Sequence, residues 1–225
     1  AKKISLTSVD DLFSTEESRV DEQREKIVEI PLSELHPFKD HPFKVIDNDA
    51  MFDTAESIKQ YGVLVPAIAR PREDGGYELV SGHRRKRACE LASLETMPVI
   101  IRNLDDDAAT IIMVDSNLQR ENILPSERAF AYKLKLSAMK RQAGRPAKEN
   151  GSQVGNNLSG KKSSELLAEQ TGESKNQIFR YIRLTELVPE LLSMVDEKKI
   201  AFNPAVELSY LKSDEQLLLI DAMDT

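Results

Sequence analysis

The sequence predicts an α+β N-terminal domain, a small mixed sheet with helices, followed by an all-α helix-turn-helix domain. Short alternating or apolar runs typical of strands occur in the first half of the chain, at 26–31, 67–70, 77–80 and 97–102. After residue 123 the apolar residues follow helical spacing instead. With 225 residues, of which 40% are hydrophobic, the chain is long enough for two small domains.

Composition excludes several classes of protein. No apolar run approaches the roughly 18–20 residues that a membrane span needs. Ala1-Lys2-Lys3 is followed by polar sequence rather than by the apolar core of a signal peptide. The single cysteine, Cys89, cannot form an internal disulfide, which fits a reducing cytoplasm. It is more typical of a small packed side chain than of a nucleophile.

The charge distribution marks one part of the chain as a candidate for nucleic-acid binding. The net charge of −7 argues against a polyanionic partner. However, residues 137–185 carry nine basic and four acidic side chains, whereas residues 186–225 carry three and nine. Because phosphate contact depends on a local basic block rather than on total charge, the first of these segments remains a candidate.

The N-terminal residues 1–25 are acidic and rich in Ser, Asp and Glu, which predicts a flexible tail. An apolar island at Val9, Leu12 and Phe13 leaves a second interpretation open, a short helix that binds a partner. Residues 26–31 then alternate and end at a proline, so we expect a strand.

The dipeptides His36-Pro37 and His41-Pro42 predict a loop. We do not expect a metal at this histidine pair, because each histidine precedes a proline and no cysteine or third histidine lies nearby. Asp49 is expected to cap the next helix, which ends at Gly62, a residue suited to the position after a helix. The buried face of this helix is expected to contain Met51, Ala55 and Ile58.

Residues 81–88 read Ser-Gly-His-Arg-Arg-Lys-Arg-Ala and lead from a strand into a helix. Gly82 permits a tight turn and close approach of a ligand to the backbone. The helix N-terminus offers N–H groups, and Arg84, Arg85 and Arg87 offer forked donors suited to phosphate oxygens. A basic helix face is also typical of a plain solvated surface, but the position directly after a glycine favours an anion site.

Three aspartates at 105–107 begin another helix, and we interpret them as caps rather than as a metal site because consecutive residues point in different directions. Pro125 begins a further helix. Its buried side is expected to contain Phe130, Leu134 and Ala138. Residues 141–162 are rich in Gly, Asn, Ser and Lys and predict either a flexible spacer or a segment that follows a DNA backbone.

Beyond this linker, helices are expected at 164–170 and 174–184, with Ala168, Gly172 and Ile178 at helix-turn-helix spacing. The alanine permits close helix approach, the glycine permits the turn and the isoleucine anchors the second helix. The candidate DNA-binding residues of this region and of the linker are Lys161, Lys162, Ser174, Lys175, Asn176, Gln177, Arg180 and Arg183.

The predicted parts of the chain are therefore a flexible tail (1–25), an α+β domain (26–122), a connecting helix (123–140), a basic linker (141–162) and a helix-turn-helix domain with its following helices (163–225). The last part is expected to contain helices near 187–192, 205–211 and 214–223.

Three ordered segments resemble the ParB family of bacterial DNA-partition proteins, which includes the Noc and KorB-like branches. Residues 55–66 resemble the family segment that packs around a nucleotide base, and residues 81–88 resemble its Gly-Glu-Arg-Arg-x-Arg-Ala box. Residues 117–127 are similar to its Glu-Asn-x-Gln-Arg-x-x-Leu-x-Pro-x-Glu box. With the helix-turn-helix, the resemblance covers about residues 26–212.

The resemblance implies a ParB/sulfiredoxin-like fold for the α+β domain and a CTP-dependent DNA clamp. In that family a homodimer binds a palindromic parS-like site, and CTP with Mg²⁺ closes the dimer into a ring that slides along DNA. A ParA-type ATPase contacts the N-terminal tail. We therefore expect a protein that serves plasmid or chromosome segregation, cytoplasmic and nucleoid-associated, truncated before the family's C-terminal dimerisation domain.

The nucleotide-binding residues implied by the resemblance are Gly62, Ser81, Gly82, His83, Arg84, Arg85, Asn117 and Arg120. Asn117 is also the candidate metal ligand, and Arg120 either braces the phosphate pocket or forms an internal ion pair. His83 and Ser116 stand where the family usually has glutamates. Because serine is a weaker ligand than a carboxylate for a hard cation, we expect CTP hydrolysis to be slow or absent.

Two rival interpretations stay open. The first is a helix-turn-helix repressor whose N-terminal domain only supports dimerisation, and it predicts that nucleotide leaves DNA binding unchanged. The second is an enzyme of the sulfiredoxin or free-serine-kinase fold, but Cys89 does not lie in the Gly-Cys-His-Arg box that sulfiredoxin chemistry needs. No pair of carboxylates has a spacing that supports a nuclease.

Overall fold

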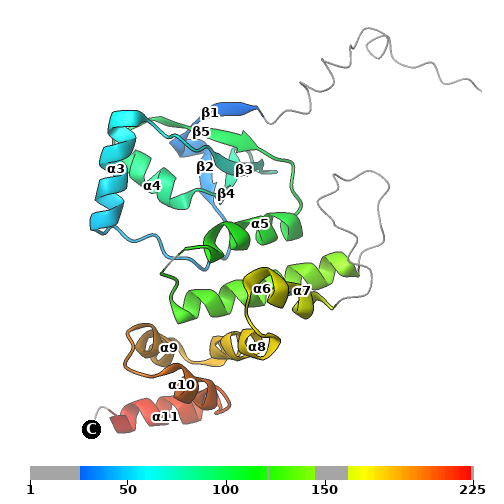
Figure 1. Ribbon diagram of the computed structural model, residues 1–225. Coiled ribbons are helices and arrows are strands. Elements are labelled where there is room, and N and C mark those ends of the chain that lie inside the picture. Colours follow the sequence, from blue (N-terminus) through cyan, green and yellow to red (C-terminus); the bar gives the residue numbers. More distant parts are fainter. Residues whose placement is uncertain (1–25, 121, 145–161, 224–225) are drawn as a thin grey trace, which may run out of the picture. The chain divides into compact units, whose positions relative to one another are not determined.

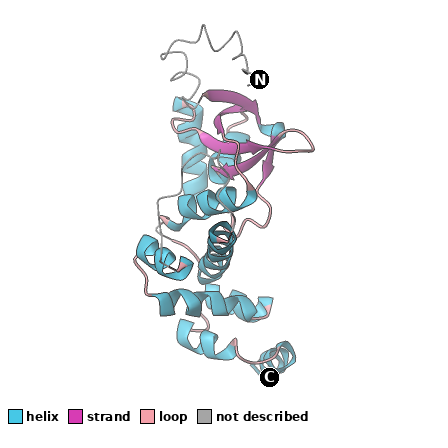
Figure 2. Cartoon of the chain, turned by 90° about the vertical axis from the view of Figure 1, so that its right-hand side faces the viewer, coloured by secondary structure: helices cyan, strands magenta, loops and turns pink. Residues whose placement is uncertain are grey.

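The computed structural model describes residues 26–120, 122–144 and 162–223 (Figures 1 and 2). The described residues form two compact units. Unit 1 takes its residues from Ala1–His36 and Asn48–Asn103, and unit 2 from Pro37–Asp47 and Leu104–Thr225. The expected tail, most of the linker and Lys161 lie outside the described residues. The domain limits drawn from the sequence stay predictions.

The sheet is five-stranded, with the order β1-β5-β3-β4-β2. Its strands are β1 (Ile27–Pro31), β2 (Leu35–Pro37), β3 (Ala67–Pro71), β4 (Tyr77–Ser81) and β5 (Thr96–Ile101). The pairs β1–β5 and β3–β4 are antiparallel, whereas β3 and β5 are parallel, so the sheet is mixed as the sequence predicts. Because β3 and β5 are parallel, the chain between them must cross over, and this crossover contains β4 and the helix that follows it.

One strand and one helix cap differ from the sequence prediction. The expected loop at His36-Pro37 is wrong, since both residues belong to β2, whose Leu35 is buried in the core of unit 1. Helix α3 (Asp49–Tyr61) is capped by Asn48 rather than by Asp49: the Asn48 Oδ1 accepts a hydrogen bond from the Met51 N–H at 3.1 Å. Asp49 instead occupies the first turn, where a carboxylate favours the helix dipole.

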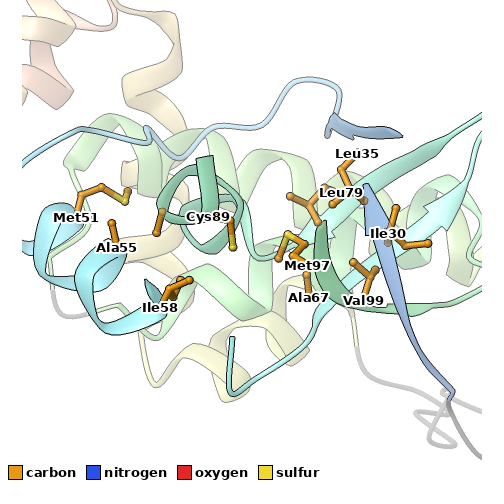
Figure 3. Close-up of a cluster of buried hydrophobic side chains, with 12 residues drawn as sticks. Ile30, Leu35, Met51, Ala55, Ile58, Ala67, Leu79, Cys89, Met97 and Val99 are labelled. Atoms are coloured by element: carbon orange, nitrogen blue, oxygen red, sulfur yellow. The ribbon is translucent and has the colours of Figure 1, made fainter. Parts of the chain in front are cut away.

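The core of unit 1 joins both helices of that unit to the sheet (Figure 3). Helices α3 and α4 (His83–Leu91) pack against each other. Their buried side chains meet strand residues in one cluster, as the predicted apolar face of α3 requires. The cluster consists of Ile30, Leu35, Met51, Ala55, Ile58, Ala67, Ala69, Leu79, Ala88, Cys89, Met97 and Val99. Cys89 is fully buried, as expected, and burial raises the pKa of its thiol.

Unit 2 is built from helices in its described residues. They are α5 (Asp106–Leu118), α6 (Pro125–Ala143), α7 (Ser163–Thr171), α8 (Lys175–Arg183), α9 (Pro189–Asp196), α10 (Phe202–Leu208) and α11 (Ser213–Met223), with the 3₁₀ turn Leu184–Glu186 after α8. Asp105 caps α5 by accepting from the Ala108 N–H at 2.8 Å, so the capping interpretation is confirmed for this aspartate. Asp106 and Asp107 lie in the first turn of the helix instead. No helix in the described ranges is long and apolar enough to cross a bilayer.

Helix α6 contributes to two apolar clusters of unit 2. Its Ala129 lies in a cluster with residues of α9 and α10, whereas its Tyr132 and Leu136 lie in a cluster with residues of α7 and α8. The predicted burial of Phe130 is wrong, because that side chain is 39% exposed. The buried stripe of α6 passes through residues 129, 132 and 136, and residue 130 lies to one side of it.

Gly82 joins β4 to α4 in a backbone conformation that side chains rarely adopt. Its φ is +110°, in the left-handed region, and it occupies the N-cap position of α4. A Cβ at this position would lie 2.8 Å from the Ala67 Cβ of β3. Glycine is therefore required both by the backbone angle and by the approach of the neighbouring strand.

Gly82→Ala is expected to lower the free energy of unfolding by about 3 kcal/mol, because left-handed strain and the contact with Ala67 add together. Gly75→Ala is the matched control. Gly75 also has a positive φ, +90°, but nothing lies within 4 Å of an added Cβ, so we expect a loss of about 1 kcal/mol. Urea unfolding followed by circular dichroism measures both variants. Equal losses would show that the Ala67 contact does not limit this turn.

Candidate functional site

The turn from β4 to α4 forms the candidate anion site of unit 1. Ser81 ends β4 and is buried, Gly82 makes the left-handed turn, and His83 begins a helix of nine residues. The first amides of a helix have no intrahelical acceptor, and the helix dipole places positive charge at the same end. The absence of a Cβ at Gly82 lets an anion approach these amides closely.

The basic residues of α4 have different partners. Lys86 and Arg87 pair with Glu90, at 3.2 and 3.1 Å. Arg85 is held by two backbone carbonyls described below. Within the described part of the chain, no group forms a hydrogen bond or ion pair with the Arg84 guanidinium. Arg84 is therefore the cation of this helix that remains available for an external anion.

Arg85 fastens the segment that follows α3. Its Nη1 donates to the Val65 and Pro66 carbonyl oxygens, each at 2.6 Å, and burial lowers the pKa of Arg85. This segment begins at Gly62, whose φ of +73° ends α3. It exposes apolar side chains, with Leu64 81% exposed and Val65 62% exposed. The predicted contact of Arg85 with phosphate stays a prediction, and the bonds observed here assign this guanidinium to shaping the backbone.

The box at 117–127, with Asp115 and Ser116 directly before it, belongs to unit 2. Asn117 is 4% exposed, and its Nδ2 donates to the Met113 carbonyl at 2.7 Å, so its Oδ1 is the atom suited to a cation. The Ser116 hydroxyl donates to the same carbonyl at 3.0 Å. The Arg120 guanidinium lies 5.5 Å from the centre of the Phe43 ring, a cation–π arrangement that favours a structural role.

Asp115 cannot replace the glutamate that the family usually has at position 116, because it forms an ion pair with Lys135. Lys135 is 1% exposed, and a buried ammonium that loses its carboxylate is strongly destabilised. No group of three His, Cys, Asp or Glu in the described ranges could hold a metal. The donors of this box therefore suit Mg²⁺ only as an ion held mainly by ligand phosphates and water.

The predicted nucleotide residues are divided between the units. Gly62, Ser81, Gly82, His83, Arg84 and Arg85 belong to unit 1, and Asn117 and Arg120 belong to unit 2. Within unit 1 the structure brings five of the six to a single strand–turn–helix. The two histidines considered as a metal pair, His36 and His41, also belong to different units. Burial lowers the pKa of His41 to about 4.

The hairpin of α7 and α8 has a glycine turn and a buried isoleucine at the two positions that the sequence spacing singles out. Gly172 follows α7 with a φ of +70°, in the left-handed region. Ile178 is fully buried beside Tyr132, Leu136 and Leu167. The two helices are therefore joined by a glycine turn and anchored to α6.

Glu173, which directly follows Gly172, has two partners on α6. It accepts from Arg128 at 3.0 Å and from the Tyr132 hydroxyl at 3.3 Å. Burial, and then the charge of Glu173, raise the pKa of Tyr132 to about 12. Sequence reasoning missed this network, although Arg128 and Tyr132 are four residues apart and so share one face of α6.

The candidate DNA residues of α8 are partly used inside the protein. Ser174 caps α8 by accepting from the Gln177 N–H at 3.1 Å, and Lys175 lies 3.7 Å from Glu165. Asn176 is exposed, and so is Lys162, which precedes α7. Arg180 and Arg183 both contact side chains of the α10 region, which the sequence did not predict.

Comparison with known proteins gives one family. Residues 16–118 match the family model described as the ParB N-terminal domain. The chain is 31% identical over 197 residues to a nucleoid occlusion protein of Listeria innocua, covering 88% of this chain and 62% of the relative. It is 30% identical over 200 residues to the stage 0 sporulation protein J of Bacillus subtilis, covering 89% and 63%.

A solved structure of a ParB protein is also similar to this chain. The C-terminally truncated chromosome-partitioning protein ParB from Caulobacter crescentus, complexed to the centromeric parS site, matches with a TM-score of 0.51 and 26% identity. The match covers 81% of this chain and 84% of that one. The chain spans about three fifths of the length of the relatives from Listeria and Bacillus, 62% and 63% respectively. By its N-terminal domain and these relatives, the chain belongs to the ParB/Noc-like family of partition proteins.

Proposed function

We propose that this chain is a sequence-specific DNA-binding partition protein that binds CTP and forms a sliding clamp on DNA. In this proposal a homodimer binds a palindromic parS-like site, serves plasmid or chromosome segregation with a ParA-type ATPase, and resides on the nucleoid in the cytoplasm. The observation that carries the nucleotide part is the left-handed Gly82 turn at the N-terminus of α4, with Arg84 beside it and available.

The chemistry of unit 1 supports a nucleoside triphosphate as the ligand. The first amides of α4 and the Arg84 guanidinium suit phosphate oxygens. The exposed apolar segment with Leu64 and Val65 suits the face of a base, and Arg85 holds the carbonyls of that segment in place. Mg²⁺ bound with the triphosphate would neutralise phosphate charge.

DNA binding through α7 and α8 is supported by the relative whose structure contains parS DNA and by the exposed polar residues of α8. Asn176 and Lys175 lie in the first turn of α8, the part of a recognition helix that enters the major groove. Arg180 lies farther along the same helix. The exposed Lys162 lies just before α7, where a basic side chain can contact the DNA backbone.

The second candidate is a helix-turn-helix repressor that does not respond to nucleotide. Two observations favour it. Ser116 replaces the usual glutamate and donates its hydrogen bond to the Met113 carbonyl, and Arg85 donates to two carbonyls of its own chain. The two candidates differ in whether CTP changes the behaviour of the protein on DNA.

Arg84→Ala is expected to weaken CTP binding at least about ten-fold, because a charge-assisted bond to phosphate is lost. Equilibrium binding of labelled CTP with Mg²⁺, competed by ATP, GTP and UTP, measures the change and the selectivity. Arg87→Ala, which removes a cation already paired with Glu90, is the matched control and should bind normally. If the wild-type protein binds no nucleotide, even with its DNA site present, the result favours the repressor over the CTP-dependent clamp.

Ser116→Glu is expected to increase DNA-stimulated CTP hydrolysis several-fold over a slow or inactive wild type, because it places a carboxylate beside Asn117. Phosphate release measured with the cognate duplex tests this. Ser116→Gln has nearly the same shape without the charge and should stay at the wild-type rate. Rapid hydrolysis by the wild type would contradict the proposed role of Ser116.

Arg180→Ala is expected to weaken binding to a selected duplex by about ten-fold while changing binding to random DNA little, since base contacts carry specificity. Lys162→Ala should weaken both alike and reduce the salt slope by about one. The duplex is selected by wild-type protein from a randomised pool, and Kd is measured over a salt series. Equal losses on both DNAs for Arg180→Ala would remove it from the base-reading residues.

A further inference from the structure

Two arginines of α8 point to helix α10, but they are bound there in different ways. Helices α8 and α10 are in contact (Figure 1). Helix α10 begins at Phe202. Arg180 contacts the exposed start of α10, whereas Arg183 contacts the residues that directly follow it. The sequence places both arginines among the candidate DNA-binding residues. The difference between their partners in the structure indicates that their roles in DNA binding differ.

Arg180 is oriented by contacts that lie at the protein surface. Its Nη2 donates to Asn203 Oδ1 at 2.6 Å, and its Nη1 lies 3.5 Å from Gln177 Oε1. Its guanidinium carbon lies 5.2 Å from the centre of the Phe202 ring, within cation–π range. A guanidinium has five N–H donors, so each of the two arginines keeps three. The difference lies in the partners, which are exposed or half-buried side chains for Arg180 and the buried Ser209 for Arg183. Asn203 is itself exposed, so this contact lies at the protein surface.

Arg183 is used to join the helices. Its Nε donates to the Ser209 hydroxyl at 3.1 Å and its Nη2 donates to the Ser209 carbonyl at 2.5 Å, so one edge of the fork is occupied. Ser209 is 1% exposed, and its hydroxyl in turn donates to the Val206 carbonyl at 2.6 Å. The guanidinium also lies 4.3 Å from the centre of the Tyr210 ring. This arginine therefore ties α8 to the end of α10.

We infer that α10 is part of the DNA-reading site: Asn203 is a positioning residue that orients Arg180 toward DNA, and Arg183 anchors α8 and reads no base. The inference rests on the proposed binding of DNA by α8. A flexible arginine loses rotamer freedom when it binds, and a side chain oriented beforehand loses less. Removing the Asn203 contact therefore weakens binding through Arg180 without removing any contact to DNA.

The decisive experiment is a double-mutant cycle between Arg180→Ala and Asn203→Ala. Kd is measured for the selected duplex and for a scrambled duplex. Asn203→Ala is expected to weaken the selected duplex about five-fold and to leave the scrambled one unchanged. In the Arg180→Ala background, the same change should have no further effect, because Asn203 acts through Arg180. Ser193→Ala, an exposed neutral residue of α9, is the matched control and should bind both duplexes normally.

Three outcomes would overturn the inference. An unchanged Asn203→Ala would show that Arg180 needs no orientation. Losses that multiply in the double variant would make Asn203 an independent DNA contact. A wild type that prefers no sequence at all would remove the proposed function first, and the inference with it. In that case the selection from the randomised pool fails before any variant is measured, so the two failures are distinguishable.

A separate experiment tests the anchoring role of Arg183. Arg183→Ala is expected to lower the melting temperature and to weaken the selected and scrambled duplexes by the same factor, because it loosens α8 as a whole. Arg183→Lys, which keeps the charge but cannot make the fork to Ser209, should behave in the same way. A loss confined to the selected duplex, with an unchanged melting temperature, would identify Arg183 as a base reader and contradict the inference.

Discussion

The close approach of Ala67 to Gly82 sets the geometry of the candidate nucleotide site. A strand and a helix can be joined by a single residue here only because that residue has no side chain to meet the neighbouring strand. The first turn of α4 is thereby held against the sheet, and Arg84 follows directly from it. Arg85, one residue further on, can then reach the carbonyls that follow α3. The backbone of the turn and the backbone of the apolar segment are thus fixed by neighbouring residues of one helix.

Local signals predicted most of the fold. The glycines at 62, 82 and 172, the aspartate cap of α5 and the apolar face of α3 each act over a few residues, so the sequence alone is sufficient to identify them. The failures involve distant partners. His36 belongs to a strand because Leu35 joins a core assembled from distant segments. Asn48 replaces Asp49 as a cap because two adjacent residues are both good caps and only the backbone angles decide between them.

The candidate site was predictable as a set of residues but not as a set of roles. Basic residues on α4 and α8 are visible in the sequence, whereas the acceptors that occupy them are not. Arg85 and Arg183 donate to backbone carbonyls. Because every residue type has a backbone carbonyl, the sequence does not indicate which residue accepts such a bond. Counting arginines therefore overestimates the number available to phosphate or DNA. The distinction between an available and an occupied guanidinium needed the folded chain.

Helix α6 couples the stability of the two apolar clusters of unit 2. Its Ala129 packs into one apolar cluster and its Tyr132 and Leu136 into another, so both clusters share one rigid rod. Opening either cluster leaves part of α6 exposed and weakens the other, which makes the two clusters lose their structure together rather than one at a time. In hydrogen-exchange terms, the amides along the middle of α6 would be among the slowest of the described residues.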